Sequence, residues 1–275
     1  MPKNKNKPLI SVIIPTYNEA NYIVDCLDSL ELQKTNFKFE VIVSDNGSTD
    51  KTAELARHHR LKPRVVKEPV RGVANARQAG LAVSKGEIIV STDADCLFQP
   101  NWLEKIANDF ENEAVVGVAG NYHFIDADLW ARVFPVLGAV LVWIIYKVTK
   151  KTIYASAANL SFRIKYVEGY SLLEPQGSDE RGIIKQLEKN GRVKVTLQNP
   201  VYTSARRVRK GFFHGVFVTI GYYYTFNVWQ TKKQGYSSVG HQPVIRTEDD
   251  DSVWVLVERY LFFLILVIFL TILFR

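Results

Sequence analysis

The first 120 residues alternate between short apolar runs and amphipathic stretches. Five short runs are predicted strands, at residues 9–14, 40–44, 64–67, 87–92 and 115–119. Several are apolar almost throughout, as strands covered on both faces usually are. Between them apolar residues recur at helical spacing, for example Ile23, Leu27 and Leu30. This alternation predicts an α/β fold with a mostly parallel sheet.

Polar and often acidic residues follow three of the predicted strands. They are PTYNE at 15–19, DNGSTD at 45–50 and DAD at 93–95. In an open parallel sheet the carboxyl ends of the strands share one edge, and ligands bind there. Asp93 and Asp95 can approach one hard cation that also holds phosphate oxygens. A lone Asp-x-Asp is usually only a solvated turn, so its place after a buried strand is what favours a metal site.

These segments also resemble a known family. The ordered set SVIIPTYNE, VIVSDNGSTD, RGVANARQAG and IIVSTDAD is similar to the family 2 glycosyltransferases, which have the GT-A fold. The resemblance covers roughly residues 9–210, and four motifs in the right order make it specific. It implies a nucleoside-diphosphate-sugar donor and a divalent cofactor, Mg²⁺ or Mn²⁺, that stabilises the leaving diphosphate.

The resemblance assigns donor-side roles residue by residue. Pro15, Tyr17 and Glu19 match the loop that packs on the base and ribose, and Asp45 matches the carboxylate that binds the base. Arg71, Gly72 and Arg77 match the helix start that faces the donor's phosphate and sugar. For Arg77 an ordinary exposed helix face is an equal alternative. Asp93 and Asp95 match the metal motif, with Asp95 as the expected direct ligand.

The second half is expected to carry the acceptor side. ASAANLSFR at 155–163 resembles the segment that lines the acceptor, with Asn159 as its most diagnostic polar residue. Farther on the family reads Glu-Asp at a helix start, where this chain has Ser178 before Asp179 and Glu180. Ser178 departs from the family, Asp179 is the expected catalytic base, and Glu180 is the alternative one residue on. A carboxylate that only stabilises a helix N-terminus is the simpler interpretation.

A basic run follows the last core strand of the predicted domain. Arg206 and Arg207 are expected to reach the diphosphate, and contact with anionic lipid headgroups is the alternative. The Gln-x-x-Arg-Trp motif of the processive, polymer-forming members is absent here. The sequence therefore favours transfer of a single sugar.

The C-terminal part is expected to contact a membrane. Residues 253–275 are apolar apart from Glu258, Arg259 and the last residue. Because about 20 apolar residues span a bilayer core, this segment is a predicted transmembrane helix, with a domain-packing helix as the alternative. The aromatic-rich stretch 211–229 is predicted to lie in the interface, with the rest of 211–252 as a linker. Residues 133–146 are predicted to form a buried or membrane-interfacial helix rather than a span.

Charge and cysteine content indicate which ligands and which cellular compartment to expect. A net charge of +7 fits phosphate-bearing ligands or anionic lipid, and no nucleic-acid partner is expected. Cys26 and Cys96 lie far apart and in no metal-ligand spacing, which indicates a reducing compartment without disulfides. Residues 1–8 form a basic tail, and the apolar run that follows it, residues 9–14, is too short for the hydrophobic region of a signal peptide. We therefore expect a membrane protein whose catalytic domain faces the cytoplasm and whose acceptor is lipid-linked.

Two rival functions remain open at this point. A nucleotidyltransferase of similar fold would need a Gly-rich, Lys-bearing N-terminal loop, which residues 15–19 do not provide. A catalytically silent membrane scaffold is expected to lose the metal carboxylates, yet Asp93 and Asp95 are both present. The expected organisation is a tail at 1–8, a GT-A domain at 9–210, an interfacial helix and linker at 211–252, and a transmembrane helix at 253–275.

Overall fold

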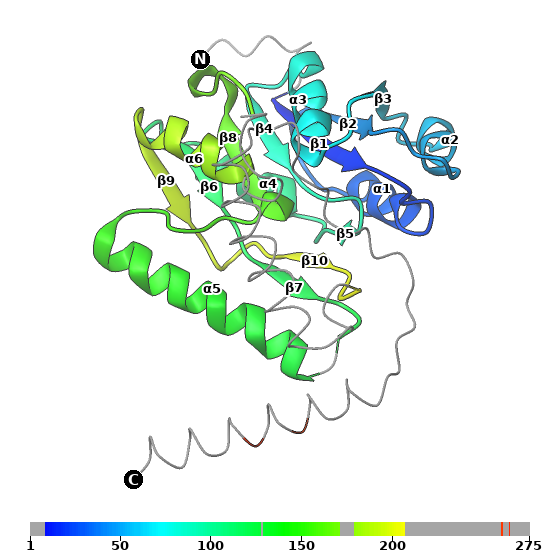
Figure 1. Ribbon diagram of the computed structural model, residues 1–275. Coiled ribbons are helices and arrows are strands. Elements are labelled where there is room, and N and C mark those ends of the chain that lie inside the picture. Colours follow the sequence, from blue (N-terminus) through cyan, green and yellow to red (C-terminus); the bar gives the residue numbers. More distant parts are fainter. Residues whose placement is uncertain (1–8, 128, 171–178, 207–259, 261–263, 265–275) are drawn as a thin grey trace, which may run out of the picture. The chain divides into compact units, whose positions relative to one another are not determined.

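A computed structural model describes residues 9–127, 129–170, 179–206, 260 and 264 (Figure 1). The chain divides into two compact units, one with residues up to His123 and from Pro135 to Thr203, the other with Phe124–Phe134 and the residues from Ser204. The elements are β1 (Ile10–Thr16), α1 (Ile23–Glu31), β2 (Phe39–Asp45), α2 (Thr52–His58), β3 (Arg64–Lys67), α3 (Val73–Val83), β4 (Ile88–Ser91), β5 (Cys96–Leu97), α4 (Trp102–Asp109), β6 (Val115–Ala119), β7 (Tyr122–Phe124), α5 (Leu129–Thr149), β8 (Leu160–Arg163), α6 (Asp179–Glu188), β9 (Arg192–Val195) and β10 (Val201–Thr203).

Seven strands form one sheet in the order β3-β2-β1-β4-β8-β6-β9, and β5, β10 and β7 form a second, smaller sheet. In the large sheet β8 runs antiparallel to both of its neighbours, while the other pairs are parallel. The predicted α/β fold with a mostly parallel sheet is therefore confirmed. All five predicted strands form, but β1 and β2 run on to Thr16 and Asp45, so the first polar residues of both loops belong to the strands.

The register of the parallel strands sets where their ends lie. Thr16 at the end of β1 is opposite Asp45 at the end of β2, and Asp45 is in turn opposite Lys67 at the end of β3. Ser91 at the end of β4 pairs with Ile13 of β1. The segments that follow these four strands therefore leave the sheet at one edge, as the sequence predicts.

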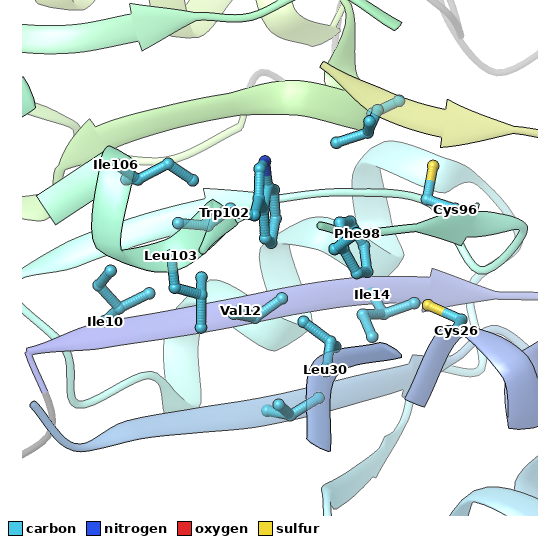
Figure 2. Close-up of a cluster of buried hydrophobic side chains, with 14 of the residues drawn as sticks. Ile10, Val12, Ile14, Cys26, Leu30, Cys96, Phe98, Trp102, Leu103 and Ile106 are labelled. Carbon is cyan, nitrogen blue, oxygen red and sulfur yellow. The ribbon is translucent and has the colours of Figure 1, made fainter. Parts of the chain in front are cut away.

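Side chains alternate between two apolar clusters on the two faces of β1. Ile10, Val12 and Ile14 pack with Trp102 and Leu103 of α4 in the cluster drawn in Figure 2. The other cluster contains residues of β1, β4, β8, β9 and α6, namely Ile13, Ile89, Leu160, Phe162, Ile183, Ile184, Leu187 and Val193. Because both faces of the sheet are covered, its strands are apolar almost throughout, and this is why they were visible in the sequence.

Helix α3 approaches the sheet closely at Gly80. A Cβ at this position would lie 2.5 Å from Cγ2 of Ile13 and 2.7 Å from Oγ of Ser44. Only glycine therefore permits the separation seen between α3 and the strands β1 and β2. This close packing brings the N-terminal half of α3, with Arg77, to the edge where β4 ends.

The described residues cover only part of the predicted membrane contact. Residues 133–146 belong to the longer helix α5, which packs one face on the protein and leaves the other exposed. None of the helices within the described residues has both the length and the apolar character needed to cross a bilayer. The predicted segments 211–252 and 253–275 lie outside the described residues, apart from Tyr260 and Leu264. Cys26 and Cys96 are both free and buried.

Candidate active site

The loops after β1 and β2 are held together by hydrogen bonds. The backbone N–H of Asn18 donates to Oγ of Ser48 at 2.9 Å, and Oδ1 of Asn18 accepts from the N–H of Thr49 at 2.7 Å. The N–H of Glu19 donates to Oγ1 of Thr52 at 2.7 Å. Asn18 has a positive φ of 53°, which Asn tolerates better than most residues. The two loops predicted to bind the nucleotide therefore act as one structural unit.

Asn46 organises the segment that carries Arg71, although the sequence analysis did not single it out. Its buried Nδ2 donates to the carbonyls of Glu68 at 3.0 Å and Val70 at 2.7 Å. Its Oδ1 accepts from the N–H of Gly72 at 2.7 Å. Gly72 has a φ of 139°, which L side chains rarely adopt, so a glycine is needed there. The DNGSTD motif could have indicated this role, since a buried Asn can satisfy three backbone groups at once.

Arg71 lies over the ring of Tyr17. Its guanidinium carbon is 3.3 Å from the ring centroid, and Nη1 donates to the carbonyl oxygen of Asn46 at 3.2 Å. Such a cation–π stack is attractive because the aromatic face is electron-rich. Asp45 is nearly buried at the end of β2, and its Oδ1 accepts from the N–H of Ser48 at 3.3 Å. The structure therefore gathers an aromatic ring, a cation and a carboxylate from three predicted positions.

Arg77 is buried, with 3% of its surface exposed, so the alternative of an exposed helix face is wrong. Its Nε donates to Oγ of Ser91 at 3.1 Å, and its Nη2 donates to Oδ1 of Asp93 at 2.7 Å. The close approach of α3 to the sheet is the reason, because it directs this side chain across the end of β4. Arg77 thus forms an ion pair with the first carboxylate of the predicted metal motif. Its contact with a donor phosphate stays a prediction.

Asp93 and Asp95 follow β4 with partly exposed carboxylates. The side chain of Asp93 is 41% exposed, and Oδ1 of Asp95 accepts from Oγ1 of Thr203 at 3.1 Å. Burial raises the pKa of Cys26 and of Cys96 well above the usual thiol value, and the negative charges of Asp95 and Asp93 raise both further. Both carboxylates therefore lie near the two buried thiols. Partly exposed carboxylate oxygens are the donors that Mg²⁺ and Mn²⁺ prefer, so the donor set fits a hard divalent cation.

Another cluster of candidate ligands occurs on α1 and after α2. Within the part of the chain that the structure describes, ligand atoms of Asp28, Glu31 and His59 lie within 4.8 Å of one another. Arg60, however, forms ion pairs with both Asp28 and Glu31. One guanidinium offsets only one of the two negative charges, so this cluster is a second group of possible metal ligands beside the predicted metal motif.

On the acceptor side Asn159 is built into the fold. Its Nδ2 donates to the carbonyls of Asn121 at 2.9 Å and Asn199 at 2.8 Å, and its Oδ1 accepts from Nε1 of Trp102 at 3.4 Å. The residue is 5% exposed, so its amide holds three segments together. Its predicted contact with a ligand stays a prediction.

The two candidate bases occupy the start of α6. Asp179 is the first residue of this helix. Oε1 of Glu180 accepts from the N–H of Ala157 at 3.0 Å, which ties α6 to the predicted acceptor segment. Arg206, which belongs to the second unit, is largely buried there, and its N–H donates to Oγ of Ser204 at 3.3 Å. Arg207 lies outside the described residues. The roles of Asp179, Arg206 and Arg207 stay predictions.

The fold and the edge of the sheet thus define an α/β domain with a compact group of acidic, basic and aromatic side chains beyond its strands. Residues 11–164 match the model of Glycosyl transferase family 2, which is more than half of the chain, so the chain belongs to this family. Among curated relatives it is 33% identical over 122 residues to glycosyltransferase GlyG of Streptococcus pneumoniae (43% of this chain, 40% of the relative). It is 37% identical over 122 residues to glycosyltransferase AglE of Haloferax volcanii (42% of this chain, 40% of the relative). The chain therefore spans about two fifths of the length of these relatives.

Solved structures show the same fold. The mannosyltransferase PcManGT of Pyrobaculum calidifontis, in complex with GDP-Man and Mn²⁺, has a TM-score of 0.57 at 23% identity, covering 72% of this chain and 57% of that one. TarS 1-349 of S. aureus in complex with UDP has a TM-score of 0.56 at 20% identity, covering 71% of this chain and 60% of that one. These likenesses confirm the expected GT-A fold.

Proposed function

We propose that this chain transfers one sugar from a nucleoside-diphosphate sugar to an acceptor hydroxyl or phosphate, with inversion at the anomeric carbon. The observation that carries the proposal is the group of side chains at one edge of the large sheet: Tyr17 under Arg71, the nearly buried Asp45, and Asp93 beside Asp95. Family membership and the curated glycosyltransferase relatives support the same reaction class.

Each donor-side residue is proposed to contact the part of the donor that suits its chemistry. Asp45 accepts hydrogen bonds and is fixed in place by the N–H of Ser48, so it suits the N–H groups of a base. Tyr17 offers an aromatic face, and Pro15 and Glu19 complete its loop. Arg71 supplies a positive charge that Asn46 holds in place, and it can make charge-assisted bonds to phosphate.

Asp95 and Asp93 would hold Mg²⁺ or Mn²⁺, and the cation would offset the charge that develops on the leaving diphosphate. Arg77 already neutralises one oxygen of Asp93. Asp95 is the expected direct ligand, as the family resemblance implies. The Mn²⁺ complex with GDP-Man of the similarly folded PcManGT supports a divalent cofactor in this fold.

On the acceptor side Asp179 acts as the base that takes the proton of an attacking hydroxyl. Glu180 holds the segment 155–163 through the N–H of Ala157. The acceptor is lipid-linked and the domain works at the cytoplasmic face of a membrane. The apolar stretch 253–275, which has two charged residues before its last position, supports this location.

A thermal-shift screen of nucleotide sugars tests the donor assignment. Uridine- and guanosine-diphosphate sugars are added to the full chain with Mg²⁺, with Mn²⁺ or with chelator. A donor at 100 times its Kd should add about 2.7 kcal/mol of stability, and only when a cation is present. Asp95→Asn should lose the cation-dependent part, whereas Asp25→Asn, an exposed carboxylate on α1, should keep it. If no nucleotide sugar stabilises the folded wild-type chain, the proposed donor class is wrong.

A further inference from the structure

Helix α5 exposes a continuous row of aliphatic side chains. The row consists of Val136, Leu137, Val140, Leu141, Ile144 and Val148, which we call the apolar stripe. Successive members of the stripe are one, three or four positions apart, as residues on one face of a helix are. Leu137 is 59% exposed, Leu141 57% and Val148 79%, so the stripe is not part of the core.

The opposite face of α5 is the one that packs on the protein. Tyr146 is buried in the second apolar cluster, and Val142 and Trp143 pack against that cluster. Successive helical residues are about 100° apart, which places Val142 and Tyr146 on the side of the helix away from the stripe and Trp143 at its margin. Since the protein side of α5 is already occupied, the stripe faces outward and lacks a cover within the part of the chain described.

The charged side chains of α5 itself are of one sign. Residues 129–149 contain no Asp or Glu. Exposed Lys147, Lys150 and Lys151 lie at the C-terminal end of α5 and just beyond it. Nζ of Lys147 is 5.0 Å from the centroid of the Trp143 ring. An aliphatic face with an aromatic ring and lysines at its margin matches the interface of an anionic bilayer, where ammonium groups reach the headgroups and apolar side chains enter the acyl boundary.

A protein partner fits this surface less well. Protein interfaces usually combine aromatic or arginine anchors with a rim of polar groups of both signs. The stripe has only aliphatic side chains, and the charged side chains of α5 itself are all positive; the carboxylate of Glu188 accepts from the N–H of Thr152 beyond the helix. Charge complementarity therefore favours anionic lipid over a second copy of the chain.

We infer that the apolar stripe of α5 rests on an anionic membrane surface and that Lys147, Lys150 and Lys151 bind its headgroups. The inference rests on the membrane location in the proposed function, and it names the surface by which the catalytic domain meets the bilayer. It is independent of donor chemistry, because none of these residues belongs to the edge of the sheet that carries the predicted site.

An environment-sensitive fluorophore on the stripe tests this inference. A cysteine replaces Leu141 in the full chain and is labelled; Cys26 and Cys96 are fully buried and are expected to remain unlabelled. The matched control is a labelled Glu54→Cys chain, with the probe on the exposed surface of α2, which has no exposed large apolar residue. Both are mixed with vesicles of equal parts phosphatidylcholine and phosphatidylglycerol that contain nitroxide-labelled lipid.

The expected result is that vesicles shift the emission of the Leu141 probe to the blue and quench at least about half of it, because an interfacial helix sinks its apolar face into the acyl boundary. The Glu54 probe should not change. Replacing Lys147, Lys150 and Lys151 by Gln should reduce the quenched fraction by about half in anionic vesicles, and not in vesicles of phosphatidylcholine alone.

Three results would overturn the inference. In the first, the chain sediments with vesicles but the Leu141 probe stays unquenched. In the second, the probe is shielded without lipid in proportion to protein concentration, which indicates a second copy on the stripe. In the third, it is shielded without lipid at every concentration, which indicates cover by another segment of the same chain. Donor-dependent thermal stabilisation of the same preparations separates these failures from a failure of the proposed function.

Discussion

Buried Arg77 donates to Asp93 across 2.7 Å, so a helix residue neutralises one of the two carboxylates predicted to hold the metal. The pair ties α3 to the loop after β4. Beside this pair, Oδ1 of Asp95 accepts from Oγ1 of Thr203 at 3.1 Å, so β10 also contacts the same loop.

The first prediction concerns the energy of this pair. A double-mutant cycle of Arg77→Met and Asp93→Asn, measured by urea unfolding, should give a coupling energy of about 1.5–3 kcal/mol, as expected for hydrogen bonds to charged groups. The control cycle uses Arg60 and Asp28, whose side chains are 68% and 43% exposed. An exposed pair should couple by less than about 1 kcal/mol. Equal coupling in the two cycles would show that burial adds nothing to the Arg77–Asp93 pair.

The second prediction concerns Asn46. Asn46→Asp removes the amide that donates to the carbonyls of Glu68 and Val70 and places a carboxylate against them. We expect a loss of about 1–3 kcal/mol in the free energy of unfolding, because buried carbonyls lose their donors. Donor affinity should fall about tenfold or more, because the segment that carries Arg71 loses its bonds from Nδ2 of Asn46 at Glu68 and Val70.

Asn190→Asp is the matched control for this change. The amide of Asn190 also donates to a carbonyl, that of Gln186 at 3.0 Å, but the residue is exposed at the end of α6. It should leave donor affinity unchanged and cost little stability. If Asn46→Asp binds the donor as tightly as wild type does, the segment 68–72 does not need Asn46 for binding.

The third prediction uses the buried thiols. Cys26 and Cys96 are both 0% exposed, and burial raises their pKa values. Iodoacetamide should therefore leave both unmodified in the native chain and modify both in denaturant. Because the folded thiols have raised pKa values, their contribution to stability is present below the unfolded thiol pKa of about 8.5 and is lost as the pH rises above it. Mass spectrometry after a timed pulse measures the modification, and rapid alkylation of the native chain would contradict the burial of these residues.

Most of the fold could be predicted from sequence because both faces of the large sheet are covered. Strands such as β4, with four buried residues in a row, produce an apolar run that is visible without a structure. β8 was not predicted as a strand, because residues 160–163 are a short segment that pairs antiparallel inside a parallel sheet. Such pairing depends on distant partners, which local pattern does not reveal.

The candidate site was predictable in kind but not in its contacts. The ends of β1, β2 and β4 meet at one edge, as strand–helix alternation requires. That Arg77 is buried against Asp93 could not be read from α3, because the decisive feature is the close approach of Gly80 to Ile13. The supporting role of Asn46 likewise depends on where the segment 68–72 folds back, which no local pattern specifies.

The last prediction decides between the two candidate bases at the start of α6. A base acts on the acceptor, so its loss should lower turnover and spare donor affinity. Asp179→Asn should bind the nucleotide sugar as wild type does and transfer it at least ~100-fold more slowly, the usual scale of general base catalysis. Glu180→Gln should keep most of its activity, because the amide oxygen of Gln can still accept from the N–H of Ala157, which Glu180 now binds at 3.0 Å. Glu180→Ala loses that bond and should raise the KM for the acceptor. Single-turnover kinetics with donor binding measured separately distinguishes the variants: a slow Glu180→Gln beside an active Asp179→Asn would make Glu180 the base, and full activity of both would place the base outside this helix.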